Sequence, residues 1–118
     1  MVRGLNCYDP MIAEALEFIA ANSRRPINVQ DVARATNTGL RTLQYRFSEY
    51  LGRPIKEEIQ RVRLERAKRE LVQSKRPLQE IAHDVGFGRA MRMYEVFRRE
   101  LGVTPREYRR QRQMEDGN

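Results

Sequence analysis

Arginine side chains recur in two short stretches of the chain, accompanied by an amide in the first, and these residue types can read the edges of nucleic-acid bases. Arg41 and Gln44 stand in the first stretch, and Arg92 stands in the second. A guanidinium can donate two hydrogen bonds to guanine O6 and N7, and a glutamine amide can pair with adenine in the same two-point way. The residue types therefore indicate sequence-dependent contact with a nucleic acid.

A helical projection separates these side chains from the apolar ones. Leu43 and Phe47 fall on one side of a helix over residues 39–51, and Phe97 does the same over residues 89–101. The opposite faces supply the candidate base-reading residues, which are Arg41, Gln44, Tyr45, Met91, Arg92 and Glu95, with Arg89 at the start of the second helix. The flanking candidates for phosphate contact are Thr42, Arg46, Arg98 and Arg99.

Each candidate also has an ordinary structural interpretation. Gln44 and Thr42 suit a solvated helix surface, and Tyr45 suits packing against a flank of the helix. Glu95 is spaced to pair with an arginine one turn away, either as a surface pair or to orient that arginine on a base. Met91 is suited to contact with a thymine methyl group.

The charge of the chain favours an anionic partner. Its 118 residues carry 23 Lys and Arg against 16 Asp and Glu, which gives a net charge of +7. Only Lys56, Lys68 and Lys75 are lysines, and arginine has the flat five-donor fork that matches phosphates and guanine edges. Residues 89–112 contain eight arginines and three glutamates, so this end is expected nearest the nucleic-acid backbone. A merely solvated basic surface is the plain alternative.

The rest of the composition excludes several other functions. Cys7 is the only cysteine and His83 the only histidine, so an internal disulfide, a clustered metal site and most histidine-based catalysis are not expected. The sequence shows no phosphate-binding loop and no paired-carboxylate site, so no enzyme activity and no cofactor are predicted. No apolar stretch is long enough to span a membrane, residues 1–9 lack a signal-peptide core, and the cytoplasm is the expected compartment.

Local signals predict an all-α chain. Strand-type alternation is absent, whereas helix caps and glycine or proline stops are frequent. The expected helices cover residues 10–22, 29–35, 39–51, 55–73, 77–85, 89–101 and 105–111, with a frayed tail from Met114. In the first helix Ile12, Ala15, Leu16, Ile19 and Ala20 form the expected buried stripe.

The helices form a repeat. Residues 29–33 match residues 78–82 at an offset of 49, and Leu43 and Phe47 match Met93 and Phe97 at an offset of 50, with the extra residue placed in the second turn. A short helix, a turn and a longer helix used twice predict two helix-turn-helix subdomains, at about 28–51 and 77–101. The linker helix at 55–73 would span about 28 Å, close to the roughly 34 Å between adjacent major grooves.

Several segments resemble the DNA-binding domain of AraC/XylS-family transcriptional regulators. They are residues 27–53, 63–71 (RLERAKREL), 81–87 (IAHDVGF) and 97–109 (FRRELGVTPREYR), and the resemblance extends over residues 12–112. It implies an all-α fold of two homeodomain-like helix-turn-helix units in a bacterial transcription factor, usually an activator that contacts RNA polymerase. By position it adds Ala90 to the base-reading set.

The sequence departs from the family pattern at the starts of both recognition helices. Gly39 stands where a serine is common, and Met91 and Met93 stand where a serine and an aromatic are usual, so the base preference of the second helix is open. The sequence of residues 41–47 (RTLQYRF) is similar to that of xylose-operon regulators. Such regulators usually carry a separate ligand or dimerisation domain ahead of this region. We therefore expect the chain to be a C-terminal fragment, with a stand-alone regulator as the alternative, and a small-molecule effector to act only through a domain absent from this chain. A helical RNA-binding or protein-interaction module is the alternative function.

Overall fold

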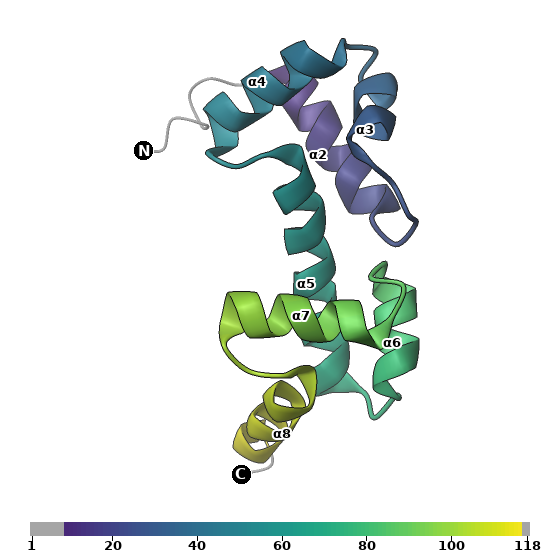
Figure 1. Cartoon of the computed structure of the whole chain (residues 1–118), viewed down its shortest axis with the longest axis vertical. Helices are drawn as coiled ribbons and strands as arrows, with labels where there is room; N and C mark the ends of the chain where they lie inside the picture. The colour runs from purple at the N-terminus through teal and green to yellow at the C-terminus, as the bar shows by residue number, and fades with distance from the viewer. Residues whose placement is uncertain (1–8, 117–118) are drawn as a thin grey trace. The chain divides into compact units, whose positions relative to one another are not determined.

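The structure, a computed structural model, describes residues 9–116, which form seven α-helices and no strand (Figure 1). The predicted all-α fold with seven helices is confirmed. The chain divides into two compact units, and the boundary lies between Val62 and Arg63, inside one continuous helix. The helices are α2 (Pro10–Asn22), α3 (Val29–Ala35), α4 (Leu40–Leu51), α5 (Ile55–Gln73), α6 (Leu78–Val85), α7 (Ala90–Leu101) and α8 (Pro105–Asp116).

The first unit is built from α2, α3, α4 and the beginning of α5. Helix α2 packs on both α3 and α4, and α3 packs on α4. The apolar stripes of these helices meet in one core, whose fully buried members include Ile19, Val32, Leu43 and Phe47. Burial of this apolar stripe fixes which face of α4 is left for solvent.

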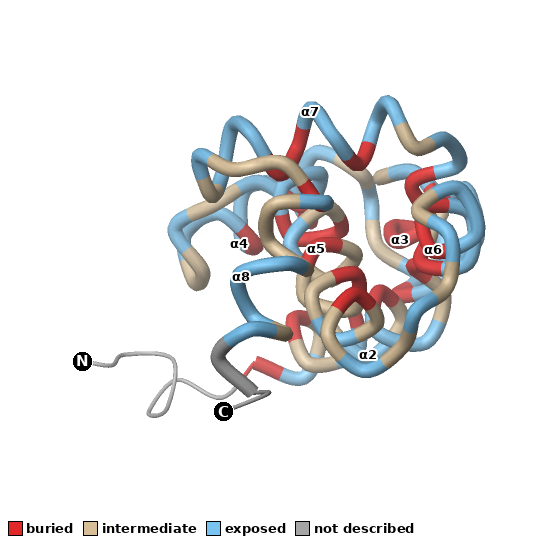
Figure 2. The backbone as a smooth tube through the Cα atoms, turned by 90° about the horizontal axis from the view of Figure 1, so that it is seen from below, coloured by how far each residue is buried: buried red, intermediate tan, exposed pale blue. Residues whose placement is uncertain are grey.

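The second unit repeats this plan with the end of α5, then α6, α7 and α8. Its core contains Leu71, Ile81, Met93 and Phe97, all fully buried. Tyr108 of α8 packs edge-to-face on Phe97, with ring centroids 5.7 Å apart. Figure 2 shows buried and exposed positions alternating along α7, as expected for a helix with one core-facing stripe.

The helix boundaries follow from capping groups that the sequence signals. Asn28 and Asp31 form a reciprocal capping box at the start of α3, and Thr104 and Glu107 form a second one at the start of α8. Helices α4 and α7 both end at a glycine in the left-handed region, since Gly52 and Gly102 have φ of 72° and 76°.

The expected end of the last helix is wrong. Helix α8 does not stop near Gln111 but continues to Asp116, because its residues are held on the last turn of α5. There Arg109 Nε donates to the Leu71 carbonyl at 3.0 Å, and Gln113 Nε2 donates to the same carbonyl at 3.4 Å. The prediction for the second turn is confirmed: Thr38 N and Phe87 N donate to the equivalent carbonyls of Ala33 and Ala82 at an offset of 49, whereas the N-caps Gly39 and Arg89 differ by 50, so the extra residue lies in the turn that precedes α7.

The predicted buried stripes were too narrow on some helices and misplaced on another. Ala20 is exposed, although Ile12, Ala15 and Ile19 are buried as expected. Leu64 of α5 and Val96 of α7 are also buried in the core of the second unit, although the apolar spacing did not single them out.

Candidate nucleic-acid interface

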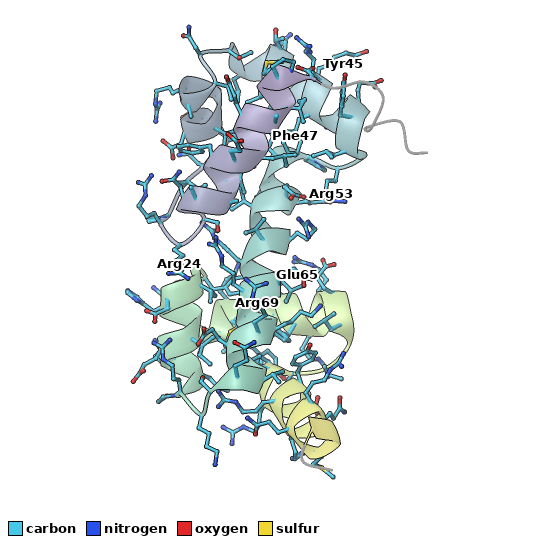
Figure 3. All side chains as sticks on the ribbon, turned by 180° about the vertical axis from the view of Figure 1, so that it is seen from behind. Arg24, Tyr45, Phe47, Arg53, Glu65 and Arg69 are labelled. Atoms are coloured by element: carbon cyan, nitrogen blue, oxygen red, sulfur yellow. The ribbon has the colours of Figure 1, made fainter. Side chains whose placement is uncertain are left out.

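The outward face of α4 carries the first group of predicted base-reading residues. Arg41, Gln44 and Tyr45 are exposed. Tyr45 is 66% exposed, whereas Phe47, two residues further along α4, is completely buried. Figure 3 labels Tyr45 and Phe47. Within residues 9–116 these three side chains make no hydrogen bond or ion pair to another described residue. Their donors and acceptors are therefore available to a ligand.

Gly39 lies at the beginning of this face of α4. It is the N-cap of α4 with extended φ and ψ of −64° and 143°, and no side chain caps the helix there. Since free backbone N–H groups at a helix start favour anions, this end of α4 is suited to a phosphate. Thr42, the predicted phosphate contact in the first turn of α4, is exposed beside Arg41.

The outward face of α7 carries the second group, with a different chemistry. Met91 is 64% exposed, and Arg92 and Glu95 are exposed on the same side of the helix. Arg92 Nη1 and Glu95 Oε1 lie 3.6 Å apart, so the pairing considered for Glu95 is present. Arg92 is therefore not an unpaired donor in the way that Arg41 is.

Arg89 and Ala90 mark the start of α7. Arg89 is the N-cap, with φ of −133° and ψ of 151°, and its side chain is exposed. Ala90 is half-buried, so its methyl group is only partly available to a base. That Arg89 and Ala90 contact bases stays a prediction.

Arg46 was predicted to contact phosphate, and the structure places it in an ion pair. Its Nη2 donates to Asp9 Oδ2 at 2.5 Å, while Asp9 Oδ1 accepts from Met11 N at 3.0 Å at the start of α2. The Asp9 side chain is 3% exposed and that of Arg46 is 48% exposed. Arg46 thus helps to fasten α4 to the cap of α2 and keeps only part of its surface for a phosphate.

The two remaining phosphate candidates, Arg98 and Arg99, are exposed on the second half of α7. Arg99 Nε donates to Glu100 Oε2 at 3.1 Å. Arg98 lies near Glu107, whose pKa is lowered first by the hydrogen bond from the Thr104 backbone and then by the Thr104 side chain and the charges of Arg98 and Arg110. Arg98 is the less constrained of the two candidates.

A further cation lies close behind the α7 face. Arg63 of α5 is half-buried, and burial followed by the nearby charge of Arg92 lowers its pKa. The two neighbouring guanidinium groups raise the positive potential on this side of the second unit. Sequence analysis missed Arg63 because its position depends on how α5 and α7 pack.

Tyr94 was missed as a base-reading candidate, although a signal was present. The offset of 50 that relates Arg41 to Met91 also relates Gln44 to Tyr94. Tyr94 is 45% exposed, and together with Met91 it borders an apolar groove of about 460 Å³ whose lining also includes Leu78 and Pro105. The equivalence of the two repeats was the available clue.

A buried carboxylate supports the connection that follows α4. Glu58 is 3% exposed, and its Oε1 accepts from Arg53 Nη1 at 2.6 Å and from Arg61 Nε at 3.0 Å. Its Oε2 accepts from Arg61 Nη2 at 2.8 Å. The cluster fixes the end of the α4–α5 loop to α5.

The described part of the chain shows no cluster of side chains that could bind a metal ion. Residues 9–116 contain no cluster of three or more histidine, cysteine or acidic residues arranged to hold a metal ion. The His83 side chain is 80% exposed beside Asp84, and Cys7 lies outside the described residues. Among the described helices none is long and apolar enough to cross a membrane.

Comparison with known proteins finds related transcriptional regulators. The family model described as a helix-turn-helix domain matches residues 32–111. A Streptomyces antibioticus protein named as an AraC-like transcription regulator is 34% identical over 102 residues, which are 86% of this chain and 34% of that protein. The xylose operon regulatory protein of Escherichia coli K12 is 30% identical over 101 residues, which are 86% of this chain and 26% of that protein.

A solved structure shares the whole fold. The DNA-binding domain of AdpA, crystallised in complex with a target DNA, superposes with a TM-score of 0.87 at 24% identity, covering 93% of this chain and 99% of that one. The chain spans about a third of the length of the first relatives, so it corresponds to one part of them. From the family match and these relatives, the chain belongs to the AraC-type helix-turn-helix family, the DNA-binding domains of transcriptional regulators.

Proposed function

We propose that the chain binds a specific duplex DNA sequence by placing α4 and α7 in two major grooves one helical turn apart. The first helix-turn-helix comprises about residues 28–51, the second about residues 77–101, and residues 55–73 link them. Arg41, Gln44 and Tyr45 read bases in the first groove, and Arg89, Ala90, Met91, Arg92 and Glu95 read bases in the second. Thr42, Arg46, Arg98 and Arg99 contact phosphates.

One observation carries most of this proposal. Arg41 and Gln44 are three residues apart in the first turns of α4, they are exposed, and they have no partner among the described residues. Exposed groups in that position are those that a recognition helix presents to base edges. A surface arginine that served only solubility would not need a fixed place beside a glutamine at this spacing.

Supporting observations come from charge and from the related structure. The net charge of +7 suits a polyanion. The AdpA domain that shares this fold was crystallised with a target DNA. The length of α5, 19 residues or about 28 Å, is compatible with two helices serving neighbouring grooves of one duplex.

Regulation would then depend on further partners. As an AraC-type domain the chain is proposed to act in the bacterial cytoplasm, where it recruits RNA polymerase as an activator. A small-molecule effector would act through another domain, since the named relatives are about three times longer than this chain. The chain itself needs no cofactor for this activity.

Competition between nucleic acids tests the proposal. A labelled duplex selected from a random pool is bound by the chain and then challenged with unlabelled duplex DNA, single-stranded RNA and double-stranded RNA of the same sequence. We expect only the duplex DNA to compete efficiently. If six to ten phosphates are contacted, affinity should fall roughly 10³–10⁵-fold between 50 and 200 mM salt.

Two outcomes would contradict the proposal. Equal competition by either RNA would favour the alternative, a helical RNA-binding module. Failure of the pool to yield any enriched duplex would favour a protein-interaction module.

A further inference from the structure

The two recognition helices present different chemistry at equivalent positions. An offset of 50 relates Arg41 to Met91 and Gln44 to Tyr94. The first helix thus offers a guanidinium and an amide where the second offers a thioether and a phenol ring. The duplicated units share a fold, but they present different side-chain chemistry at these two positions.

We propose that α7 reads its half of the DNA site mainly through apolar contact, with Met91 and Tyr94 lying against the 5-methyl groups of thymine. This inference rests on the proposed function, because it concerns the same interface. It assigns Tyr94 as a specificity-determining residue and makes thymine the preferred base opposite this face.

Exposure is the first observation behind this inference. Met91 and Tyr94 are 64% and 45% exposed, although both are large and apolar in most of their surface. Residues three apart on a helix are neighbours, so the two side chains form one patch. The patch continues into the apolar groove that Leu78 and Pro105 help to line. A contiguous apolar surface of this kind marks an interaction site.

The state of the polar groups on α7 is the second observation. Arg92 and Glu95 lie 3.6 Å apart as an ion pair, and Arg63 is close enough for the charge of Arg92 to act on it. A guanidinium that binds guanine through two hydrogen bonds must first leave its carboxylate, which weakens its net contribution. On α4, by contrast, Arg41 and Gln44 have no partner to leave among residues 9–116. The apolar side chains of α7 are therefore the ones immediately ready to contact bases.

The chemistry of the major groove identifies the partner of such a patch. Thymine is the base that presents a methyl group there, and the other exposed edge atoms are hydrogen-bond donors or acceptors. Covering one methyl group is expected to strengthen binding about fourfold. One or two thymines opposite Met91 and Tyr94 would give a measurable preference without any hydrogen bond.

Removal of single methyl groups tests the inference directly. In the duplex selected by the intact chain, each thymine is replaced in turn by deoxyuridine, which loses only the methyl group. We expect about fourfold weaker binding at one or two positions, all within one of the two conserved blocks. Met91→Ala should abolish this response at those positions, and Met91→Leu, which keeps an apolar side chain, should retain it.

Met114 supplies a matched control. It is 65% exposed on α8 of the same unit, so Met114→Ala removes an equally exposed thioether. This variant should respond to deoxyuridine as the unaltered chain does. Tyr94→Ala should reduce the response to a neighbouring thymine.

Each contrary result has a distinct meaning. A selected duplex that binds with no dependence on any methyl group in either block would overturn the apolar readout while leaving DNA binding intact. A methyl response that persists unchanged in Met91→Ala and Tyr94→Ala would assign the patch to a protein partner in the apolar groove. Failure to select any duplex would overturn the proposed function, and this inference with it.

Discussion

The Arg46 guanidinium lies 2.5 Å from the Asp9 carboxylate, so that a cation on α4 is fastened to the residue that begins α2. Both residues belong to the first unit. Because Asp9 is almost completely buried, this pair helps to fix the recognition helix on the helix beneath it. The arginine that sequence alone placed at a phosphate thus has a structural partner as well.

Removing the Asp9 carboxylate should destabilise the first unit. Asp9→Ala deletes the acceptor for Met11 N and the partner of Arg46, and we expect a loss of about 1–2 kcal/mol in the free energy of unfolding. Urea denaturation followed by far-ultraviolet circular dichroism measures it. Asp9→Asn keeps a capping oxygen and loses only the ion pair, so a loss as large as that of Asp9→Ala would contradict the role of the cap.

Glu58 should contribute more to the free energy of unfolding than its neighbour Glu57, although both are glutamates in the first turn of α5. Glu58→Gln places an amide NH₂ group against the donors of Arg53 and Arg61, and we expect a loss of about 2 kcal/mol. Glu57→Gln, at an exposed position, should change stability by less than about 0.5 kcal/mol. Equal effects in thermal unfolding would show that the buried cluster contributes nothing special.

Arg98→Ala should weaken binding to all duplexes alike, because a phosphate contact carries no sequence information. The slope of log affinity against log salt should become shallower by about 0.9 for one lost phosphate contact. Arg24→Ala removes the same charge from the bend after α2 and serves as the control. A loss restricted to the selected sequence, or an unchanged slope, would place Arg98 at a base or away from the DNA.

The stability of the second unit should decrease at acid pH through Glu107. The hydrogen bond from the Thr104 backbone lowers the pKa of this carboxyl in the folded state, so the unfolded chain takes up the proton first. The contribution is present above the unfolded pKa of about 4.3 and is lost as the pH falls through the lower folded pKa. In Glu107→Gln the melting temperature should fall less as the pH decreases through that range. If the melting temperature of this variant falls with pH as steeply as that of the unaltered chain, Glu107 is not the cause of the acid destabilisation.

Most of the fold was predictable from local signals. The capping boxes at Asn28 and Thr104 and the glycines that end α4 and α7 gave helix boundaries within a residue. Apolar spacing at Leu43, Phe47 and Phe97 identified the buried side of both recognition helices. These signals are short-range, so they can be read from neighbouring residues without knowledge of the tertiary contacts.

The features that were missed depend on residues distant in the sequence. The true length of α8 rests on Gln113 reaching the carbonyl of Leu71, which is 42 residues away. The pair between Arg46 and Asp9 joins residues 37 apart, and no periodic pattern signals it. Tyr94 was also missed, but it does not depend on a distant contact. The internal repeat, with its offset of 50, already relates Tyr94 to Gln44.

The central proposal is that α4 and α7 each read a separate part of one duplex. Selection from a random duplex pool, repeated with Arg41→Ala and with Met91→Ala, tests this directly. We expect two conserved blocks with centres about 10 base pairs apart. Arg41→Ala should cost about 1–3 kcal/mol and relax one position of the first block, while Met91→Ala relaxes only the second. A single conserved block, or relaxation of the same block by both variants, would contradict the account.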